Sequence, residues 1–225
     1  MAVLSIENLE KQYFIPGEGM QVVLSVDNFQ LSTSEQVALK GSSGCGKSTF
    51  LNTIAGITSF ERGSIIVDGI DIQKLNEAQR DKLRGQKIGY IFQSFHLLPG
   101  YTAYENVILG MSFNGNMNHD LAKDLLVRVG LEDRMLHTPG QLSVGQRQRV
   151  AVARALANNP CLVLADEPTA NLDIELSLSV IQLIKDLCTE YNAAMLLVTH
   201  DDEILSQFGS IKNLEIINKA YGATS

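Results

Sequence analysis

Nine consecutive residues, Gly-Ser-Ser-Gly-Cys-Gly-Lys-Ser-Thr at 41–49, constrain the fold of this chain more than any other feature. They match the pattern G-x-x-x-x-G-K-S/T, follow an apolar run at 36–41 and lead into a helical stretch. A strand, a glycine-rich loop and a helix in this order form a phosphate-binding loop, because the loop turns its backbone N–H groups toward phosphate oxygens. The pattern predicts that Lys47 reaches the β and γ phosphates of a nucleotide and that the Ser48 hydroxyl binds Mg²⁺.

Apolar runs recur along the chain and predict two kinds of sheet. Four of them are nearly continuous, as in strands buried on both faces of a parallel sheet, at 36–41, 87–93, 161–166 and 193–200. Four helical stretches alternate with them, at 47–57, 119–130, 145–159 and 175–191. This order predicts an α/β fold with helices on both faces of the sheet. Two alternating runs at 3–9 and 22–31, joined by a turn at 15–20, predict antiparallel strands near the N-terminus.

The stretch between the runs at 87–93 and 161–166 is mainly helical and too long for an ordinary crossover connection. We interpret residues 94–159 as an inserted α-helical subdomain. Residues 1–93 and 160–225 then form a nucleotide-binding core with its antiparallel β-subdomain, and the chain of 225 residues is a single domain.

Two adjacent carboxylates end the apolar run at 161–166. Asp166, at the tip of the predicted strand, suits Mg²⁺ held through water, since Mg²⁺ keeps most of its hydration shell. Glu167 is placed to orient or deprotonate an attacking water. By itself the pattern is equally typical of a strand that ends in an acidic turn, but beside a phosphate-binding loop it favours nucleotide hydrolysis.

Two further polar residues, Gln93 and His200, end buried strands of the same predicted sheet. Ligands of open α/β sheets bind at the carboxyl edge of the strands, where both side chains are expected to emerge. The alternative is that His200 is a surface or capping residue and that Gln93 is only a polar strand terminator.

Charge and cysteine content exclude two classes of protein. A formal net charge of −7 and a pI of about 5.1 argue against a nucleic-acid-binding protein with a broad basic surface. Three cysteines without a close pair argue against a disulfide framework and favour a reducing compartment. The first residues lack the pattern of a signal peptide, and no apolar run approaches the ~20 residues of a membrane span. We therefore expect a soluble, cytosolic chain that reaches a membrane only through a partner.

Along residues 1–222 the chain resembles the nucleotide-binding ATPase subunit of ABC transporters, a P-loop NTPase with a RecA-like core. Six ordered motifs carry the resemblance: the Walker A loop at 41–49, Gln93 in the Q-loop, the signature Leu-Ser-Val-Gly-Gln at 142–146, the Walker B strand at 162–167, the D-loop at 170–173 and the switch histidine His200. The signature is the most diagnostic of these motifs, because other P-loop ATPases lack it.

The resemblance implies a site for ATP and Mg²⁺. The ATP-binding residues are then Tyr13, stacked on the adenine, and the loop residues Gly41, Ser42, Ser43, Gly44, Cys45, Gly46, Lys47, Ser48 and Thr49. It assigns Mg²⁺ to Ser48, Gln93 and Asp166, and catalysis to Glu167, His200, Lys47 and Gln93. A simple packing role is the alternative for Tyr13.

The resemblance also implies that two copies of the chain pair head to tail around two MgATP. Ser143, Gly145 and Gln146 of one copy, at a helix N-terminus, then bind the ATP held by the other copy. Val144 stands where the family most often has glycine. If that position requires glycine's backbone freedom, Val144 weakens dimer closure. If the backbone is ordinary helix, Val144 is nearly neutral, and we favour this second interpretation.

Residues 92–110 and 146–173 resemble the subgroup that includes lipoprotein-releasing LolD, macrolide-export MacB and cell-division FtsE. This implies an ATP-hydrolysing subunit on the cytoplasmic face of the inner membrane, which drives conformational work in a membrane permease docked near Phe95–Pro99. The work would be lipoprotein release, export or mechanotransmission. The alternatives are a soluble ABC ATPase of translation or DNA maintenance, and a nucleotide-binding module that has lost hydrolysis.

Cys45 departs from the serine or other small residue that is commoner at this position of the family's loop. A helix N-terminus and the neighbouring Lys47 should both lower the pKa of its thiol. We therefore expect a maleimide to modify Cys45 and block ATP binding, and bound MgATP to exclude the maleimide.

Overall fold

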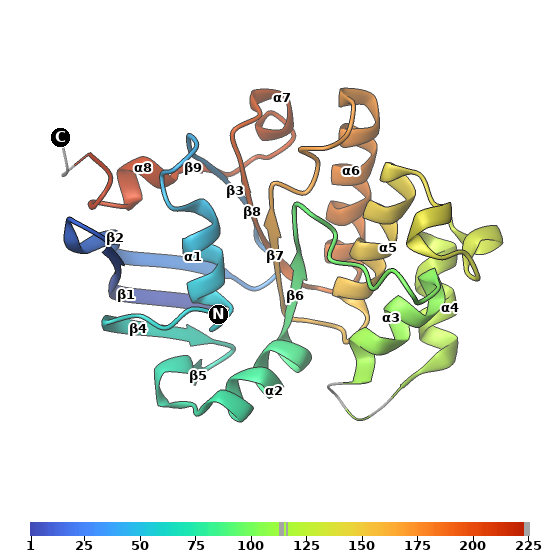
Figure 1. The fold of residues 1–225 in the computed structure, drawn as a ribbon, viewed down its shortest axis with the longest axis horizontal. Helices are drawn as coiled ribbons and strands as arrows, with labels where there is room; N and C mark the ends of the chain where they lie inside the picture. The colour runs from blue at the N-terminus through green and yellow to red at the C-terminus, as the bar shows by residue number, and fades with distance from the viewer. Residues whose placement is uncertain (113–114, 116, 223–225) are drawn as a thin grey trace.

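The computed structural model describes residues 1–112, 115 and 117–222. It contains a parallel sheet and an antiparallel sheet, with helices around them (Figure 1). None of the described helices combines the length and the apolar character that a membrane span requires. Both predicted kinds of sheet are present, and the expected α/β class is confirmed.

The larger sheet is parallel and contains the four continuous apolar runs. Its strands lie in the order β6–β7–β8–β3–β9 and comprise Ile88–Ile91 (β6), Leu162–Asp166 (β7), Ala194–Thr199 (β8), Gln36–Lys40 (β3) and Ile211–Asn213 (β9). Asp166 pairs with Val198, and Lys40 pairs with Thr199. The carboxyl ends of β7, β8 and β3 therefore meet at one edge of the sheet.

The smaller sheet is antiparallel, with strand order β2–β1–β4–β5. Its strands comprise Ala2–Ile15 (β1), Gly19–Ser32 (β2), Arg62–Val67 (β4) and Ile70–Asp71 (β5). The pairing of β1 with β2 runs from Ala2 opposite Ser32 to Ile15 opposite Gly19. The predicted hairpin is therefore present and longer than its two alternating runs, whereas β4 and β5 lie outside the predicted strands.

The α-helices of the described residues are Lys47–Ile54 (α1), Glu77–Lys87 (α2), Ala103–Met111 (α3), His119–Arg128 (α4), Val144–Leu156 (α5), Ile174–Glu190 (α6), Asp202–Leu205 (α7) and Leu214–Ile217 (α8). Short 3₁₀ turns lie at Ile72–Lys74, Glu132–Arg134 and Pro139–Gln141. The side chains of Asn76, Thr102 and Ser143 each accept a hydrogen bond from the N–H three residues on, and so fix the starts of α2, α3 and α5. The helices α3, α4 and α5 lie together at the end of the molecule away from the antiparallel sheet (Figure 1).

The parallel sheet separates two hydrophobic cores, and this explains why its central strands β7 and β8 are nearly continuous apolar runs. Val163 and Ala165 of β7 pack into the core that contains α3, α4, α5 and α6. Leu162 and Leu164 of the same strand pack into the core that contains α1 and the antiparallel sheet. Because side chains on both faces enter an apolar core, the polar residues of β7 and β8 stand only at the strand ends, as Asp166 and Thr199 do.

The strand β6 passes close to α5 at Gly89. A Cβ atom on Gly89 would lie 2.4 Å from the carbonyl oxygen of Ala155. Since that oxygen belongs to a helix backbone and cannot rotate away, this close approach requires glycine.

Candidate functional site

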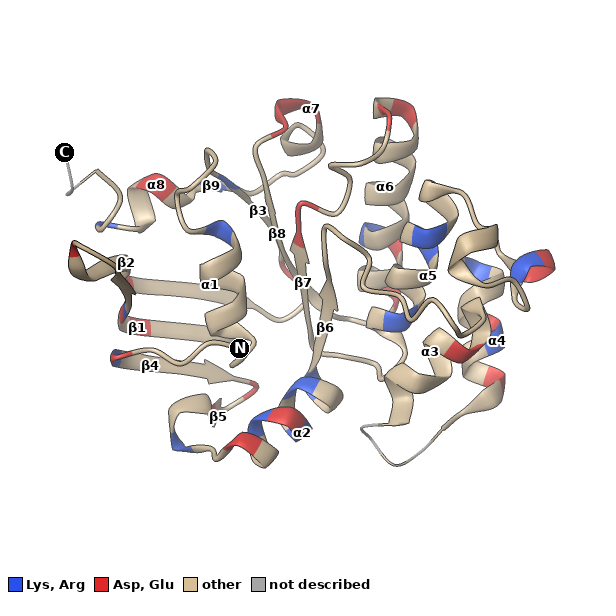
Figure 2. Cartoon of the chain, in the orientation of Figure 1, with Lys and Arg blue, Asp and Glu red and all other residues tan. Residues whose placement is uncertain are grey.

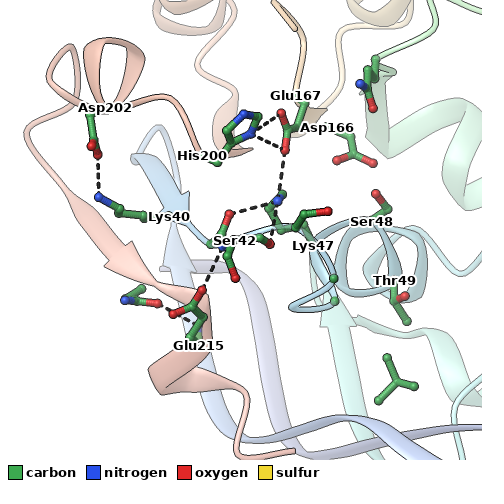
Figure 3. Close-up of a pocket in the computed structure, with 17 residues that line it drawn as sticks. Lys40, Ser42, Lys47, Ser48, Thr49, Asp166, Glu167, His200, Asp202 and Glu215 are labelled. Atoms are coloured by element: carbon green, nitrogen blue, oxygen red, sulfur yellow. Dashed lines mark hydrogen bonds and ion pairs between the residues drawn. The ribbon is translucent and has the colours of Figure 1, made fainter. Parts of the chain in front are cut away.

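The carboxyl edge of the parallel sheet opens into a cavity of about 770 Å³ (Figure 3). The loop between β3 and α1 forms one wall, and residues at the end of β7 or shortly after β6, β7 and β8 form the other. Its lining includes every predicted loop residue except Cys45, together with Gln93, Asp166, Glu167 and His200. The structure thus brings together the side chains that the sequence places at this edge.

The phosphate-binding loop turns into α1 at Gly46. Its φ of 96° is left-handed, a conformation that glycine adopts readily and other residues rarely do. Gly46 also carries no side chain to cap the helix, so the first N–H groups of α1 are left for an anion in the cavity.

Lys47 is nearly buried and its ammonium is surrounded by oxygen atoms. Nζ donates to the carbonyl oxygens of Gly41 at 3.0 Å and Ser42 at 2.9 Å. It also lies 3.1 Å from Oε1 of Glu167, as an ion pair. The ammonium is therefore held over the loop, where its charge suits an anion that enters the cavity.

Glu167 connects this lysine to the histidine that follows β8. His200 Nδ1 lies 2.9 Å from Glu167 Oε1 and 2.8 Å from Oε2 (Figure 3). The backbone of Glu167 is left-handed, with a φ of 43°, and its N–H donates to the carbonyl of Val198 at 3.0 Å. A left-handed backbone is strained for a residue other than glycine, and such strain is concentrated at functional sites because it aims a side chain.

Asp166 lies beside the Ser48 hydroxyl at the other wall of the cavity. Burial raises the pKa of Asp166, and the hydrogen bond from the Ser48 hydroxyl partly opposes that rise. With the amide of Gln93 on the same cavity, the three side chains offer carboxylate, hydroxyl and amide oxygens. Mg²⁺ prefers oxygen donors of these kinds, so the residues fit the ion that the sequence predicts.

The segment after Gln93 is held from two sides. Asn171 Nδ2 donates to the carbonyl of Gln93 at 3.1 Å. Arg154, on α5, donates to the carbonyls of Phe95 at 2.6 Å and His96 at 2.5 Å. Phe95 and His96 both have left-handed backbones, with φ of 56° and 46°. The two hydrogen bonds from Arg154 hold this strained segment against α5. Burial of the guanidinium lowers the pKa of Arg154.

The signature residues begin α5 and do not line the cavity of their own chain. Ser143 caps the helix: Gln146 N donates to Ser143 Oγ at 3.2 Å, and Ser143 N donates to Gln146 Oε1 at 2.9 Å. Val144 is the first residue of α5, with a right-handed backbone and 36% of its surface exposed. Its backbone therefore agrees with the second of the two interpretations above, in which valine replaces glycine without strain.

The expected lowering of the pKa of the Cys45 thiol is wrong, whereas its labelling by maleimide stays a prediction. The side chain is only 1% exposed, and burial raises the pKa of its thiol because desolvation of the thiolate outweighs the nearby charge of Lys47. A Cβ on Gly41 would lie 2.5 Å from Cys45 Sγ, so the thiol points inward behind the loop. A residue in the loop does not have to face the cavity.

Tyr13 is not brought into the cavity either. Its side chain is 39% exposed near the end of β1, and the ammonium of Lys11 lies 4.8 Å from the centre of its ring. Stacking of Tyr13 on a base therefore stays a prediction.

Other residues line the cavity that sequence reasoning did not select, namely Val23, Lys40, Asp202, Asn213 and Glu215. Lys40 stands at the end of a predicted strand, immediately before the loop, and this position in the sequence could have indicated that it lines the cavity. No sequence pattern indicates Glu215 in the same way, because the strand before it, β9, has only three residues and is too short to be predicted.

A second cavity of about 440 Å³ lies beside the segment after Gln93. His96 and Leu98 line it, as do Tyr90 and Phe92, whose rings stack with centres 4.0 Å apart. Its remaining lining residues are Asp81, Arg84, Gly85, Ile88, Gly89, Asn106, Leu109, Gly110, Arg154, Ala155 and Asn158. It is thus a mainly apolar groove between α2, β6, α3 and α5, with charged residues within it.

Comparison with known proteins agrees with these motifs. Residues 24–170 match the family described as ABC transporter. The lipoprotein-releasing system ATP-binding protein LolD of Shewanella frigidimarina is 42% identical over 209 residues, which cover 92% of this chain and 87% of the relative. The ABC transporter ATP-binding protein YtrE of Bacillus subtilis is 39% identical over 210 residues, 91% of each chain.

Solved structures give the same result. The ATP-binding cassette MJ0796, as a dimer in a post-hydrolysis state bound to ADP and Pi, aligns with a TM-score of 0.85 and 38% identity over 93% of each chain. A second dimeric structure of MJ0796, described as a bacterial ABC transporter cassette, aligns with a TM-score of 0.84. The family match and these relatives agree with the signature helix and the phosphate-binding loop. The chain therefore belongs to the ABC transporter family.

Proposed function

We propose that this chain is the ATP-binding and ATP-hydrolysing subunit of a membrane transporter complex. One observation carries the proposal: a single cavity collects the phosphate-binding loop, the carboxylates Asp166 and Glu167, and His200. A site with an anion cradle on one wall and a carboxylate paired with histidine on the other suits phosphoryl transfer to water.

The residues divide into three roles in this site. The loop amides and Lys47 bind the β and γ phosphates. Ser48, Asp166 and Gln93 hold Mg²⁺, which when bound neutralises charge on the phosphates. Glu167 orients the attacking water and accepts its proton, and His200 positions the carboxylate through the hydrogen bond at Nδ1.

The signature residues of this chain serve a second copy. Ser143, Gly145 and Gln146 lie outside their own cavity, at the N-terminus of a helix, where a phosphate of another chain's nucleotide can bind. The dimeric form of the MJ0796 structures supports a pair of copies, which we propose is arranged head to tail. Two MgATP then lie between the copies, and Tyr13 stacks on the adenine.

The membrane subunit docks in the groove beside Phe95–Pro99, on the cytoplasmic face of the inner membrane. Arg154 holds this segment against the signature helix, so docking and ATP binding act on one structural unit, the helical subdomain at 94–159. The other unit, 1–93 with 160–225, holds the nucleotide. The LolD relatives favour lipoprotein release or a related extraction.

A soluble ABC ATPase of translation or DNA maintenance is the second candidate, but the charge distribution does not favour it. Basic and acidic residues are mixed along α2 and α4, and the basic residues of α5 are only three arginines (Figure 2). With a net charge of −7, we propose no nucleic-acid partner.

Steady-state ATP hydrolysis tests the proposal. The purified chain is expected to release phosphate from ATP only with Mg²⁺, and Lys47→Ala is expected to abolish ATP binding and hydrolysis. Recovery of the tagged chain with a detergent-solubilised integral membrane protein separates the transporter subunit from a soluble ATPase. Hydrolysis that Lys47→Ala leaves intact would rule out this site.

A further inference from the structure

Three side chains near the end of the described chain contact the phosphate-binding loop, and one of them, Glu215, also lines the cavity. They are Glu215, on α8, and Asn218 and Tyr221, which follow it at intervals of three residues. Their targets are two residues of the loop, Ser42 and Cys45. We define these three residues as the C-terminal clamp.

All three polar groups of Ser42 have protein partners. Its N–H donates to Glu215 Oε1 at 2.9 Å (Figure 3), and its carbonyl accepts from Lys47 Nζ at 2.9 Å. Its Oγ lies 2.9 Å from the hydroxyl of Tyr221. Ser42 is thus fixed by the clamp on one side and by Lys47 on the other.

The second point of attachment is buried. Asn218 is 1% exposed and its Nδ2 donates to the carbonyls of Cys45 at 3.2 Å and Val23 at 2.9 Å. Its Oδ1 accepts from Ser25 N at 2.8 Å. One amide therefore joins the loop to the edge strand β2, and the backbone bond from Lys219 N to Ser25 O, at 2.8 Å, anchors the segment there.

We propose that Glu215, Asn218 and Tyr221 are positioning residues that hold the phosphate-binding loop in its anion-binding shape. The inference rests on the proposed nucleotide site and adds residues that none of the sequence motifs contains. A loop that binds phosphate through backbone N–H groups has to be curled before the anion arrives, since ordering it during binding would cost affinity. The clamp supplies that order through its contacts with Ser42 and Cys45.

The charge of Glu215 is not explained by a role in packing alone. The hydroxyl and N–H of Ser42 both stabilise the carboxylate and lower the pKa of Glu215, so it is ionised at neutral pH. It is a negative charge on a cavity proposed to bind a polyanion. Charge alone opposes nucleotide binding here, whereas the hydrogen bond to Ser42 favours it, and the two effects are separable by mutation.

The test compares Glu215→Gln with Glu215→Ala in the full chain. Both substitutions remove the charge, but only glutamine keeps an oxygen that accepts from Ser42 N–H. Calorimetric titration with MgADP is expected to show about three- to tenfold weaker binding for the alanine variant than for the glutamine variant. Glutamine is expected to bind as well as the wild type or better. At saturating ATP, kcat is expected to be the same in both variants, because the clamp does not touch the reacting atoms.

Two further variants keep the test decisive. Tyr221→Phe keeps the ring, loses only the hydroxyl, and is expected to weaken MgADP binding about twofold or more. Ile216→Ala, on the same helix and 78% exposed, is the matched control and is expected to bind as the wild type does. Equal affinity of the glutamine and alanine variants would overturn the clamp. A wild-type chain that does not bind MgADP would instead overturn the proposed nucleotide site.

Discussion

Lys47 Nζ and Glu167 Oε1 lie 3.1 Å apart, so the lysine assigned to the phosphates is paired with the carboxylate assigned to the attacking water. An incoming phosphate offers Lys47 a stronger set of oxygen acceptors than one carboxylate does. We therefore expect nucleotide binding to compete with this ion pair and to free Glu167 for the attacking water. The ion pair keeps the two side chains oriented into the cavity until then.

Glu167→Gln is expected to separate binding from hydrolysis. The amide keeps the size of the side chain but cannot take a proton, so hydrolysis should fall at least about a hundredfold, as for the loss of a general base. Light scattering of this variant should show a monomer without nucleotide and a dimer with MgATP. The double variant with Lys47→Ala should stay monomeric and serves as the control.

Two outcomes would contradict this account. Hydrolysis at the wild-type rate in Glu167→Gln would remove Glu167 from the reaction. A monomer that binds MgATP without pairing would show that the head-to-tail dimer does not form from this chain alone.

Val144→Gly is expected to change hydrolysis by less than about twofold, because the backbone at this position is right-handed and glycine gains nothing there. Ser143→Ala, one residue earlier, is the comparison. It removes the cap of α5 and is expected to lower the free energy of unfolding by about 1 kcal/mol, with a larger loss of hydrolysis. A gain of tenfold or more in Val144→Gly would show that the position requires glycine.

Maleimide labelling is expected to be slow at neutral pH at all three cysteines. Burial raises the pKa of Cys161 to about 11 and that of Cys188 to about 12, and it raises the pKa of Cys45 as well. Only the thiolate reacts, so labelling of the partly exposed Cys161 should rise about tenfold per pH unit between pH 7 and 10. Cys45 and Cys188 should react only when the protein opens.

Mass spectrometry of the labelled chain tests this order, with Cys161→Ser as the control. Fast labelling of Cys45 at pH 7 that MgATP prevents would restore the expectation from the sequence.

Gly89→Ala is expected to lower the free energy of unfolding by about 1–3 kcal/mol, the range for forcing an extra methyl into a packed interior. The new Cβ would lie 2.4 Å from the Ala155 carbonyl, and β6 and α5 would have to separate. Urea denaturation measures the difference. Gly100→Ala is the matched control, since a Cβ there meets no heavy atom within 4 Å, and equal destabilisation of the two variants would contradict the reason given.

The sequence predicts the part of the fold that depends on long, regular patterns. Continuous apolar runs identify β7 and β8 because both faces of these strands are buried. The strand β9 has only three residues, Ile211–Asn213, and is too short to show a pattern. The helix α2 is mostly polar, so its apolar face is too narrow to be recognised, although its cap at Asn76 was available as a signal.

The same contrast applies to the site. Residues of the loop and strand ends were predictable because a linear motif places them on one edge. Glu215 reaches the loop through a contact across 173 positions of the chain, and no local pattern reports such a contact. The sequence does not predict the burial of the Cys45 thiol. Its neighbours in sequence suggest a reactive thiol, whereas the packing behind the loop determines its accessibility.

The helix α5 joins Ser143 at its first turn to Arg154 near its other end, roughly 16 Å away at the rise of an α-helix. A hydrogen-bonded helix of this length bends little. Displacement of its N-terminal end at Ser143 therefore tilts the whole of α5. The carbonyls of Phe95 and His96, fastened to Arg154, have to follow. If Ser143 meets a second copy as proposed, one helix spans the distance from that interface to the groove, and we expect a movement at one end to reach the other without unfolding of any element between them.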